Sequence, residues 1–229
     1  TISQFGKESI YIHFIKKPKH LLNGIKKYLN LQKKNKIICF SAPFDVSGVE
    51  LLKKCNCPIY KVASPEIEDL RLIEEIAKTK KPVIISTGIA DEKNIQTAIN
   101  ICKKFGNYNV ILLNCISSYP AKNFELNLKY INVLKKFCPI VGYSDHSNSD
   151  LASIISVAKG AKIVEKHFIL SKKIKSPDSL FSYDPIQFKN LIKNIREVEI
   201  MLGSETVNKK EIIKKKLKIV SRSIFYSND

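Results

Sequence analysis

Two histidines, His146 and His167, have the residue type and the setting of metal ligands. His146 ends the stretch VGYSDH (141–146), and His167 lies in the stretch AKIVEKHF (161–168). Each follows a short apolar run that itself follows helical sequence, so both are predicted at strand ends on the same edge of a sheet. Two imidazoles facing each other there can form half of a metal site, although a lone histidine at a strand end is more often an ordinary hydrogen-bonded residue. Four flanking polar residues favour the metal site: Ser144, Asp145, Glu165 and Lys166.

Further polar side chains follow the other apolar runs. Lys61, inside an otherwise apolar run, is either a partner for phosphate or carboxylate or an edge lysine that reaches solvent. Gly88 either lets the backbone approach a ligand or forms a turn. Glu66 and Asp178 can move a proton or bond a hydroxyl, and Tyr119 can stack on a sugar, although capping and packing are the ordinary fates of such residues. Small hydroxyls that suit an oxyanion, or a turn, are Ser64, Ser86, Thr87, Ser117 and Ser144.

Apolar runs alternate with helical sequence at a spacing of ~25 residues, which predicts the elements that carry these side chains. Strands are expected at 37–40, 59–63, 82–85, 110–113, 139–141 and 163–164. Helices are expected at 20–33, 46–54, 68–79, 91–105, 126–137, 149–159 and 185–202. Strands joined by helical crossovers must pair in parallel.

The polar residues fall at the carboxyl end of every predicted strand, as in barrel enzymes, whereas an open doubly wound sheet binds its ligand at one switch point. We therefore expect an α/β fold, a (β/α)8 TIM-type barrel with about six βα units present. In a complete barrel the first two strands would precede Thr1.

The composition narrows the class of partner. The 229 residues carry a formal charge of +18, but only three of the 39 basic residues are arginines and the lysines are spread along the chain. This pattern disfavours nucleic acid and leaves attraction of an anionic substrate open. No apolar run approaches the ~20 residues of a membrane span, and no signal peptide is present at the start, so no membrane association is expected. Six cysteines without CxxC spacing indicate free thiols in a reducing cytoplasm.

Seven stretches occur in a fixed order: SAPFD (41–45), YKVASPE (60–66), PVIISTG (82–88), NCISSYPA (114–121), VGYSDHS (141–147), EKHF (165–168) and SPDSLFS (176–182). Through them, from Ser41 to Gly203, the chain resembles the sialic acid synthase family. These enzymes condense phosphoenolpyruvate with an N-acetylated hexose into a nine-carbon ulosonic acid. STGIA (86–90), SSYPA (117–121) and PDSLFS (177–182) are closer to pseudaminic acid synthases than to N-acetylneuraminate synthases.

The resemblance implies roles for particular residues. His146 and His167 would be the ligands of a divalent metal, Mn²⁺ or Mg²⁺. Phosphoenolpyruvate would be held by Lys61, Ser64, Ser86, Cys115, Ser117 and Ser144. The sugar would be held by Glu66, Tyr119, Asp178, Phe44 and Phe181, with Glu66 and Asp178 also counted as catalytic.

The resemblance also implies a domain organisation. Residues 1–203 would be a partial barrel domain, and 204–229 a linker toward an antifreeze-like domain. The family's enzymes are typically homodimers in which the partner's antifreeze-like domain completes the sugar site. Ala42 stands where the family has a hydroxyl residue. A catalytic Glu, an Asn-His pair and a second phosphate-binding Lys of the family find no match in residues 1–35, so the fragment alone is not expected to be a complete enzyme.

Two other functions fit the same residues. A metal-dependent or Schiff-base barrel aldolase or isomerase acting on a phosphosugar would also use a rim lysine and histidines. A non-catalytic, basic barrel fragment could bind anions as a domain of a larger assembly. The acceptor could be a 2,4-diacetamido-2,4,6-trideoxy-altrose or an N-acetylmannosamine, and the sequence leaves this choice open.

Overall fold

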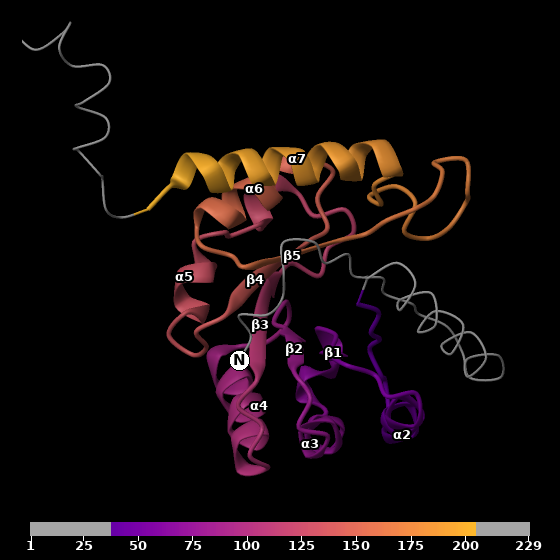
Figure 1. Ribbon diagram of the computed structural model, residues 1–229, viewed down its shortest axis with the longest axis vertical. Coiled ribbons are helices and arrows are strands. Elements are labelled where there is room, and N and C mark those ends of the chain that lie inside the picture. Colours follow the sequence, from indigo (N-terminus) through magenta and orange to yellow (C-terminus); the bar gives the residue numbers. More distant parts are fainter. Residues whose placement is uncertain (1–37, 205–229) are drawn as a thin grey trace, which may run out of the picture.

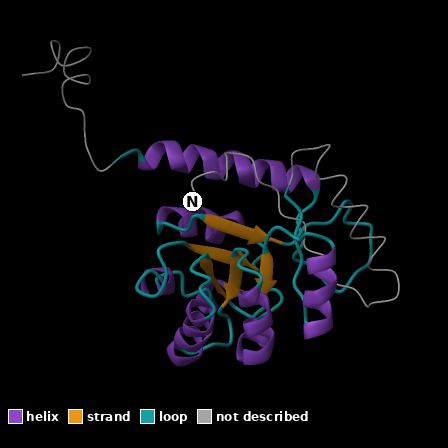
Figure 2. Cartoon of the chain, turned by 60° about the horizontal axis from the view of Figure 1, so that its bottom comes forward, coloured by secondary structure: helices purple, strands orange, loops and turns teal. Residues whose placement is uncertain are grey.

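The computed structural model describes residues 38–204. Within them five strands form one parallel sheet in the order β1-β2-β3-β4-β5. The strands are β1 (Tyr60–Val62), β2 (Val83–Ser86), β3 (Val110–Cys115), β4 (Val141–Asp145) and β5 (Ile163–Lys166). Because the spatial order never reverses along the chain, the sheet has no switch point and is of the barrel type, not the doubly wound type. It curls into about half of a (β/α)8 barrel (Figure 2).

Six α-helices of the described part cover the outside of this curled sheet (Figure 1). They are α2 (Val46–Lys54), α3 (Leu70–Lys78), α4 (Glu92–Lys104), α5 (Tyr130–Leu134), α6 (Asp150–Ala158) and α7 (Pro185–Leu202). Side-chain caps fix where several of them begin. Asp91 and Asn94 form a reciprocal capping box at the start of α4, and Asp184 and Gln187 do the same for α7. Each cap satisfies backbone donors that the first helical turn leaves without partners.

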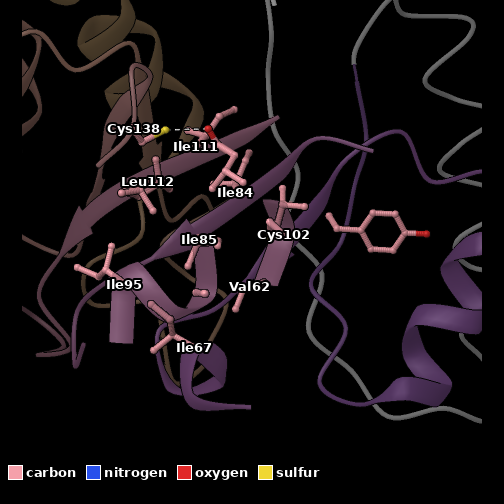
Figure 3. Close-up of a cluster of buried hydrophobic side chains, with 14 of the residues drawn as sticks. Val62, Ile67, Ile84, Ile85, Ile95, Cys102, Ile111, Leu112 and Cys138 are labelled. Atoms are coloured by element: carbon pink, nitrogen blue, oxygen red, sulfur yellow. Dashed lines mark hydrogen bonds between the residues drawn. The ribbon is translucent and has the colours of Figure 1, made fainter. Parts of the chain in front are cut away.

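Side chains alternate between two faces along each strand, and this alternation separates core from site. The outer face carries fully buried apolar side chains, such as Val62, Ile85 and Leu112, which pack under the helices. Figure 3 shows some of these residues together with Ile84 and Ile111 of the other face. The Cys138 thiol donates to the Val110 carbonyl at 2.8 Å. The inner face carries the polar residues toward the carboxyl ends of the strands. Below them it is apolar, with Ile84, Ile111 and Leu113 buried.

The sequence predicted most elements correctly and two incorrectly. A strand was expected over 37–40, but residues 38–40 are not in a strand, and this edge meets β1 only through the parallel bridge Ser41↔Tyr60. The nearby Pro43 has no N–H with which to extend a ladder. The helix expected over 126–137 is shorter: Asn127 has φ 47°, a left-handed conformation that a helix does not tolerate, and α5 begins only at Tyr130.

Two predicted strands differ from the observed ones in length, and one predicted helix cannot be compared with the structure. The two histidine strands are longer than predicted, because they run to Asp145 and Lys166. The helix predicted over 20–33 lies outside the described residues. No helix of the described chain is both long enough and apolar enough to span a bilayer.

Candidate active site

Two imidazoles meet at the carboxyl ends of β4 and β5. His146 and His167 each follow the last residue of their strand on its inner face, and their ring centroids lie 5.4 Å apart. The predicted convergence of the two histidines is therefore present in the fold. Tyr119 lies against the pair, with ring centroids 4.3 Å from His146 and 6.3 Å from His167. Phe181 completes the aromatic cluster, 4.8 Å from the His167 ring.

The surroundings of His146 determine which ring nitrogen is available. Its Nδ1 atom lies 2.7 Å from the Ile116 carbonyl oxygen, which can only accept, so Nδ1 carries the proton and Nε2 keeps a free lone pair. Burial lowers the pKa of His146, which favours the neutral imidazole. The backbone carbonyl of His146 also accepts from the Ala121 N–H at 3.0 Å. A neutral imidazole held through Nδ1 is the form in which histidine ligates a metal.

His167 is held differently. Its Nδ1 atom lies 3.7 Å from Asp178 Oδ2, and its carbonyl oxygen accepts from the Tyr183 N–H at 2.7 Å. Asp178 is half exposed, whereas Phe181, three residues later, is buried. The segment between β5 and α7 thus brings one carboxylate and one aromatic ring onto the imidazole pair.

A buried cationic cluster around Lys61, which we call the Lys61 pocket, lies next to the histidines on the inner face. Lys61 is 3% exposed, and its Nζ atom donates to Ser86 Oγ at 2.6 Å. The same Nζ lies 3.7 Å from Glu165 Oε1, which accepts from Ser144 Oγ at 2.7 Å. Ser144 Oγ is in turn 3.4 Å from Nε2 of His146. This chain of contacts joins β1, β2, β4 and β5 and connects the lysine to the imidazoles.

Gly88 lies at a crowded position that has no room for a side chain. A Cβ atom built on it would lie 2.6 Å from Ser117 Oγ, 2.8 Å from Cys115 Sγ and 2.9 Å from Ser64 Oγ. Side chains from the ends of two strands, β1 and β3, therefore converge on Gly88, which follows β2. Ser64 Oγ also accepts from the Ile89 N–H at 2.9 Å. Burial raises the pKa of the Cys115 thiol, so it lines the pocket as a neutral group.

Glu66 has an oxygen without a partner. Its Oε2 atom is buried, and among residues 38–204 nothing hydrogen-bonds to it. Burial raises the pKa of this carboxyl, and the field of Lys61 acts in the opposite direction as a smaller effect. A buried acceptor without a partner is costly, so Glu66 is suited to receive a hydrogen bond from a ligand.

Exposure grades from the floor of the site to its rim. Lys61, Ser86 and Ser144 are buried, whereas Tyr119 is 54% exposed and Asp178 is half exposed. The group suited to anions therefore lies deep, and the residues expected to hold a sugar lie at the mouth.

Phe44 was expected at the site but does not join the other candidate residues, and Glu165 was not predicted as a site residue although it contacts them. Phe44 is 47% exposed and, within the described chain, its ring makes no contact with the aromatic cluster of Tyr119, His146, His167 and Phe181. Glu165 was named only as a neighbour of the histidines, yet it contacts both Lys61 and Ser144. The signal was available, because a residue two positions before His167 in a strand shares its face.

The residues present fit a divalent cation only in part. Among residues 38–204 no group of three or more His, Cys, Asp or Glu side chains is arranged to hold a metal ion. If His146 and His167 were the donors, they would leave several coordination positions to substrate and water. Open positions are what a catalytic metal requires, as opposed to a structural one.

The sequence and the fold are similar to those of known proteins. A family profile described as the NeuB family matches residues 4–207, a longer range than the seven motifs cover. A pseudaminic acid synthase of Helicobacter pylori is 38% identical over 228 residues, covering 98% of this chain. A pseudaminic acid synthase of Campylobacter jejuni is 42% identical over 194 residues, covering 84% of this chain. The crystal structure of an N-acetylneuraminic acid synthetase from Leptospira borgpetersenii, in complex with citrate, superposes with a TM-score of 0.78 at 29% identity, covering 92% of this chain and 79% of that one.

The two synthases are longer than this chain. The match covers 66% of the Helicobacter protein and 56% of the Campylobacter protein, so the chain spans between half and two thirds of their length.

Proposed function

The chain belongs to the NeuB family, and from this premise we propose that its whole protein condenses phosphoenolpyruvate with an N-acetylated hexose, forming a nine-carbon ulosonic acid and inorganic phosphate. The observation that carries the proposal is the convergence of the His146 and His167 imidazoles beside the Lys61 pocket. The similarity to two pseudaminic acid synthases favours a 2,4-diacetamido-2,4,6-trideoxy-altrose as acceptor over N-acetylmannosamine.

We assign the deep pocket to the phosphate of phosphoenolpyruvate. Lys61 supplies a buried positive charge, and Ser86 and Ser144 supply hydroxyls next to it. Ser64, Cys115 and Ser117 surround Gly88, so that the backbone there can approach the ligand closely. Holding the enol in a fixed position converts a bimolecular step into an effectively unimolecular one, which can lower the barrier by several kcal/mol.

The rim residues would hold the acceptor. Tyr119 and Phe181 offer aromatic faces to the sugar, and the orphaned Glu66 oxygen accepts from one of its hydroxyls. Asp178, beside His167, can bond a second hydroxyl or carry a proton. A Mn²⁺ or Mg²⁺ ion held by His146 and His167 would polarise the aldehyde oxygen of the open-chain sugar.

The bonds that change follow from these positions. Carbon 3 of phosphoenolpyruvate forms a bond to the aldehyde carbon, which leaves positive charge at carbon 2. The aldehyde π bond breaks as this bond forms, so the aldehyde oxygen takes up a proton and becomes a hydroxyl. Water adds to carbon 2 and supplies that proton. The tetrahedral intermediate collapses as its new hydroxyl loses a proton and becomes the carbonyl, which breaks the bond between carbon 2 and the phosphate oxygen. Inorganic phosphate leaves with that oxygen. Lys61 and the hydroxyls hold the phosphate from the start of the reaction until it departs.

The decisive experiment follows an oxygen label. Phosphoenolpyruvate with ¹⁸O in the bridging oxygen, incubated with the purified full-length protein, Mn²⁺ and the diacetamido sugar, should release phosphate that carries the label, as mass spectrometry detects. Phosphate release without the sugar, or unlabelled phosphate, would contradict the proposed reaction. Borohydride would trap the imine of a Schiff-base aldolase and inactivate that enzyme. It should not inactivate this protein, because Lys61 is ion-paired with Glu165 and suits an anion rather than a carbonyl carbon.

Glu66→Gln tests the assignment of the acceptor site. We expect kcat/KM for the sugar to fall by about 10²-fold, because a positioned carboxylate typically contributes at least that factor when it moves a proton. Since burial raises the pKa of Glu66, the acidic limb of the wild-type pH profile should lie above the range of an ordinary carboxyl and should disappear in the variant.

Phosphoenolpyruvate affinity, measured by calorimetry, is the control, because Glu66 lies outside the Lys61 pocket assigned to phosphate. A variant with wild-type kcat/KM for the sugar would remove Glu66 from the site.

The domain organisation is part of the proposal. We place residues 1–203 in the barrel domain and 204–229 before an antifreeze-like domain, as the greater length of the matched synthases supports. The half-exposed rim at Tyr119 and Asp178 is suited to completion by that domain of a partner subunit in a homodimer.

A further inference from the structure

A buried ion pair lies directly behind the two histidines. Asp145 and Lys166 are the last residues of β4 and β5 and stand opposite each other in the strand register. Their side chains are 0% and 1% exposed, and Lys166 Nζ lies 3.0 Å from Asp145 Oδ2. Because side chains alternate along a strand, these two point to the outer face while the next residues, His146 and His167, point to the inner face.

Further contacts turn the pair into a clamp across the two strands. Asp145 Oδ1 accepts from the Ser147 N–H at 2.8 Å, and Oδ2 accepts from Ser153 Oγ of α6 at 2.6 Å. Lys166 Nζ donates to the Ser147 carbonyl at 2.5 Å. Asp145 and Ser147, on either side of His146, are therefore both bonded to Lys166, the residue before His167. Asp145 also bonds Ser147 directly. Helix α6 lies over β4 and β5, which excludes water from this face (Figure 1).

The same clamp reaches the segment that follows His167. Lys166 Nζ lies 4.4 Å from the centre of the Tyr183 ring, and the Tyr183 N–H donates to the His167 carbonyl. Tyr183 is itself fixed by its hydroxyl, which donates to Asp150 at the start of α6 at 2.5 Å. The backbone on both sides of each histidine is thus tied to one buried network.

Stability alone does not account for such a pair. Two charges taken fully out of water pay a desolvation penalty that their attraction often fails to exceed, and apolar replacements of similar volume are often neutral or stabilising. A charged pair with directional hydrogen bonds does, however, fix the geometry of the two strand ends that carry it. On the opposite face of the sheet, the same strand ends set the distance between the two imidazoles.

We infer that Asp145 and Lys166 are positioning residues that set the spacing of His146 and His167 and thereby the affinity of the site for a divalent cation. The inference rests on the proposed function, in which these histidines hold the metal. It assigns a role on the reverse side of the sheet to residues that touch neither metal nor substrate.

The test removes both charges at once, so that neither is left buried without its partner. In the full-length protein, Asp145→Asn/Lys166→Met keeps the volume of both side chains and an acceptor for the Ser147 N–H. We expect the dissociation constant for Mn²⁺, measured by electron paramagnetic resonance titration, to rise by about 10–100-fold, the range typical for lost supporting contacts of metal ligands. Phosphoenolpyruvate affinity without metal should stay within about twofold of wild type, because the buried charge of Lys61 and the hydroxyl of Ser86 lie on other strands and Ser144 itself is unchanged. A merely structural defect would weaken both affinities.

A matched control is Asn107→Ala. Asn107 is also buried and hydrogen-bonded, to the Lys81 carbonyl at 2.8 Å, but it lies at the amino-terminal end of the sheet. It should lower the melting temperature and leave Mn²⁺ affinity unchanged. Asp145→Asn/Lys166→Gln, which also removes both charges and retains a donor for the Ser147 carbonyl, serves as the second variant if the first double variant does not fold.

The outcomes separate the inference from the proposed function. Weaker Mn²⁺ binding with intact phosphoenolpyruvate binding supports the clamp. Three outcomes would overturn the inference and leave the pair a purely structural role. They are an Mn²⁺ affinity within about threefold of wild type, an equal loss of Mn²⁺ and phosphoenolpyruvate affinity, and failure of both variants to fold. Wild-type protein that binds no Mn²⁺ would overturn the metal assignment of the proposed function, and the inference with it.

Discussion

Alanine at either His146 or His167 should lower kcat/KM for the condensation by about 10³-fold or more and abolish tight binding of Mn²⁺. The reason is that a metal acting as a Lewis acid supplies several kcal/mol of transition-state stabilisation, and each 1.36 kcal/mol is a factor of ten in rate. The two rings lie 5.4 Å apart with Nε2 of His146 unprotonated, so each variant removes one of two converging donors. Phosphate release and Mn²⁺ titration measure the two effects.

A control within the same cluster is Tyr119→Phe. It keeps the ring that stacks on His146 at 4.3 Å and removes only the hydroxyl, so Mn²⁺ affinity should remain at the wild-type level. Phosphoenolpyruvate affinity in the two histidine variants should change little, since Lys61 and Ser86 are intact. Full metal-dependent activity in either histidine variant would show that the metal is held elsewhere.

Gly88→Ala should weaken phosphoenolpyruvate binding by about 10²-fold, the cost typical of displacing positioning groups by ~1 Å. The new methyl group would lie less than 3.0 Å from the side-chain oxygens of Ser64 and Ser117 and the sulfur of Cys115, so at least one of them must move into the phosphate pocket. The substitution brings no backbone strain, because Gly88 is not among the glycines with positive φ. Calorimetry with phosphoenolpyruvate and the KM of the reaction measure the effect.

Ser117→Ala provides the comparison for this variant. It removes one hydroxyl from the same wall without adding volume, and the loss of a single neutral hydrogen-bonding group should weaken binding by about tenfold or less. A larger effect from the added methyl group than from the removed hydroxyl identifies close approach as the role of Gly88. Phosphoenolpyruvate affinity within about threefold of wild type in Gly88→Ala would mean that the phosphate lies elsewhere.

Much of this fold could be predicted because its signals are periodic. Apolar runs alternating with helical sequence give parallel strands, and the polar residues after each run identify the edge that carries chemistry. The failures were local. Asn127 adopts a left-handed conformation that its residue type permits but does not require, so the late start of α5 had no firm sequence signal. The expected strand before Ser41 depends on partners that only the assembled sheet reveals.

The site was predictable as a set of residues and less so as a set of contacts. Strand alternation implies that His146 and His167 share a face, but only three-dimensional structure brings Glu165 between Lys61 and Ser144. Phe44 was expected beside the sugar through resemblance, yet it lies away from the aromatic cluster in the described chain. Asp145 and Lys166 were noted in the sequence only as polar neighbours of the histidines. The positioning role that we infer for them had no sequence signal, because a charged residue at a strand end gives no indication of burial.

The gradient of exposure, from buried Lys61 to half-exposed Tyr119 and Asp178, has a kinetic consequence. Within the described half-barrel, Ile84, Ile111 and Leu113 are buried below the lysine, so the approach to Lys61 that these residues leave is from the rim. An acceptor already seated at Tyr119 would obstruct that route. For the proposed reaction we therefore expect phosphoenolpyruvate to bind first and the hexose second. The bound hexose would then keep phosphoenolpyruvate in the site until the carbon–carbon bond has formed.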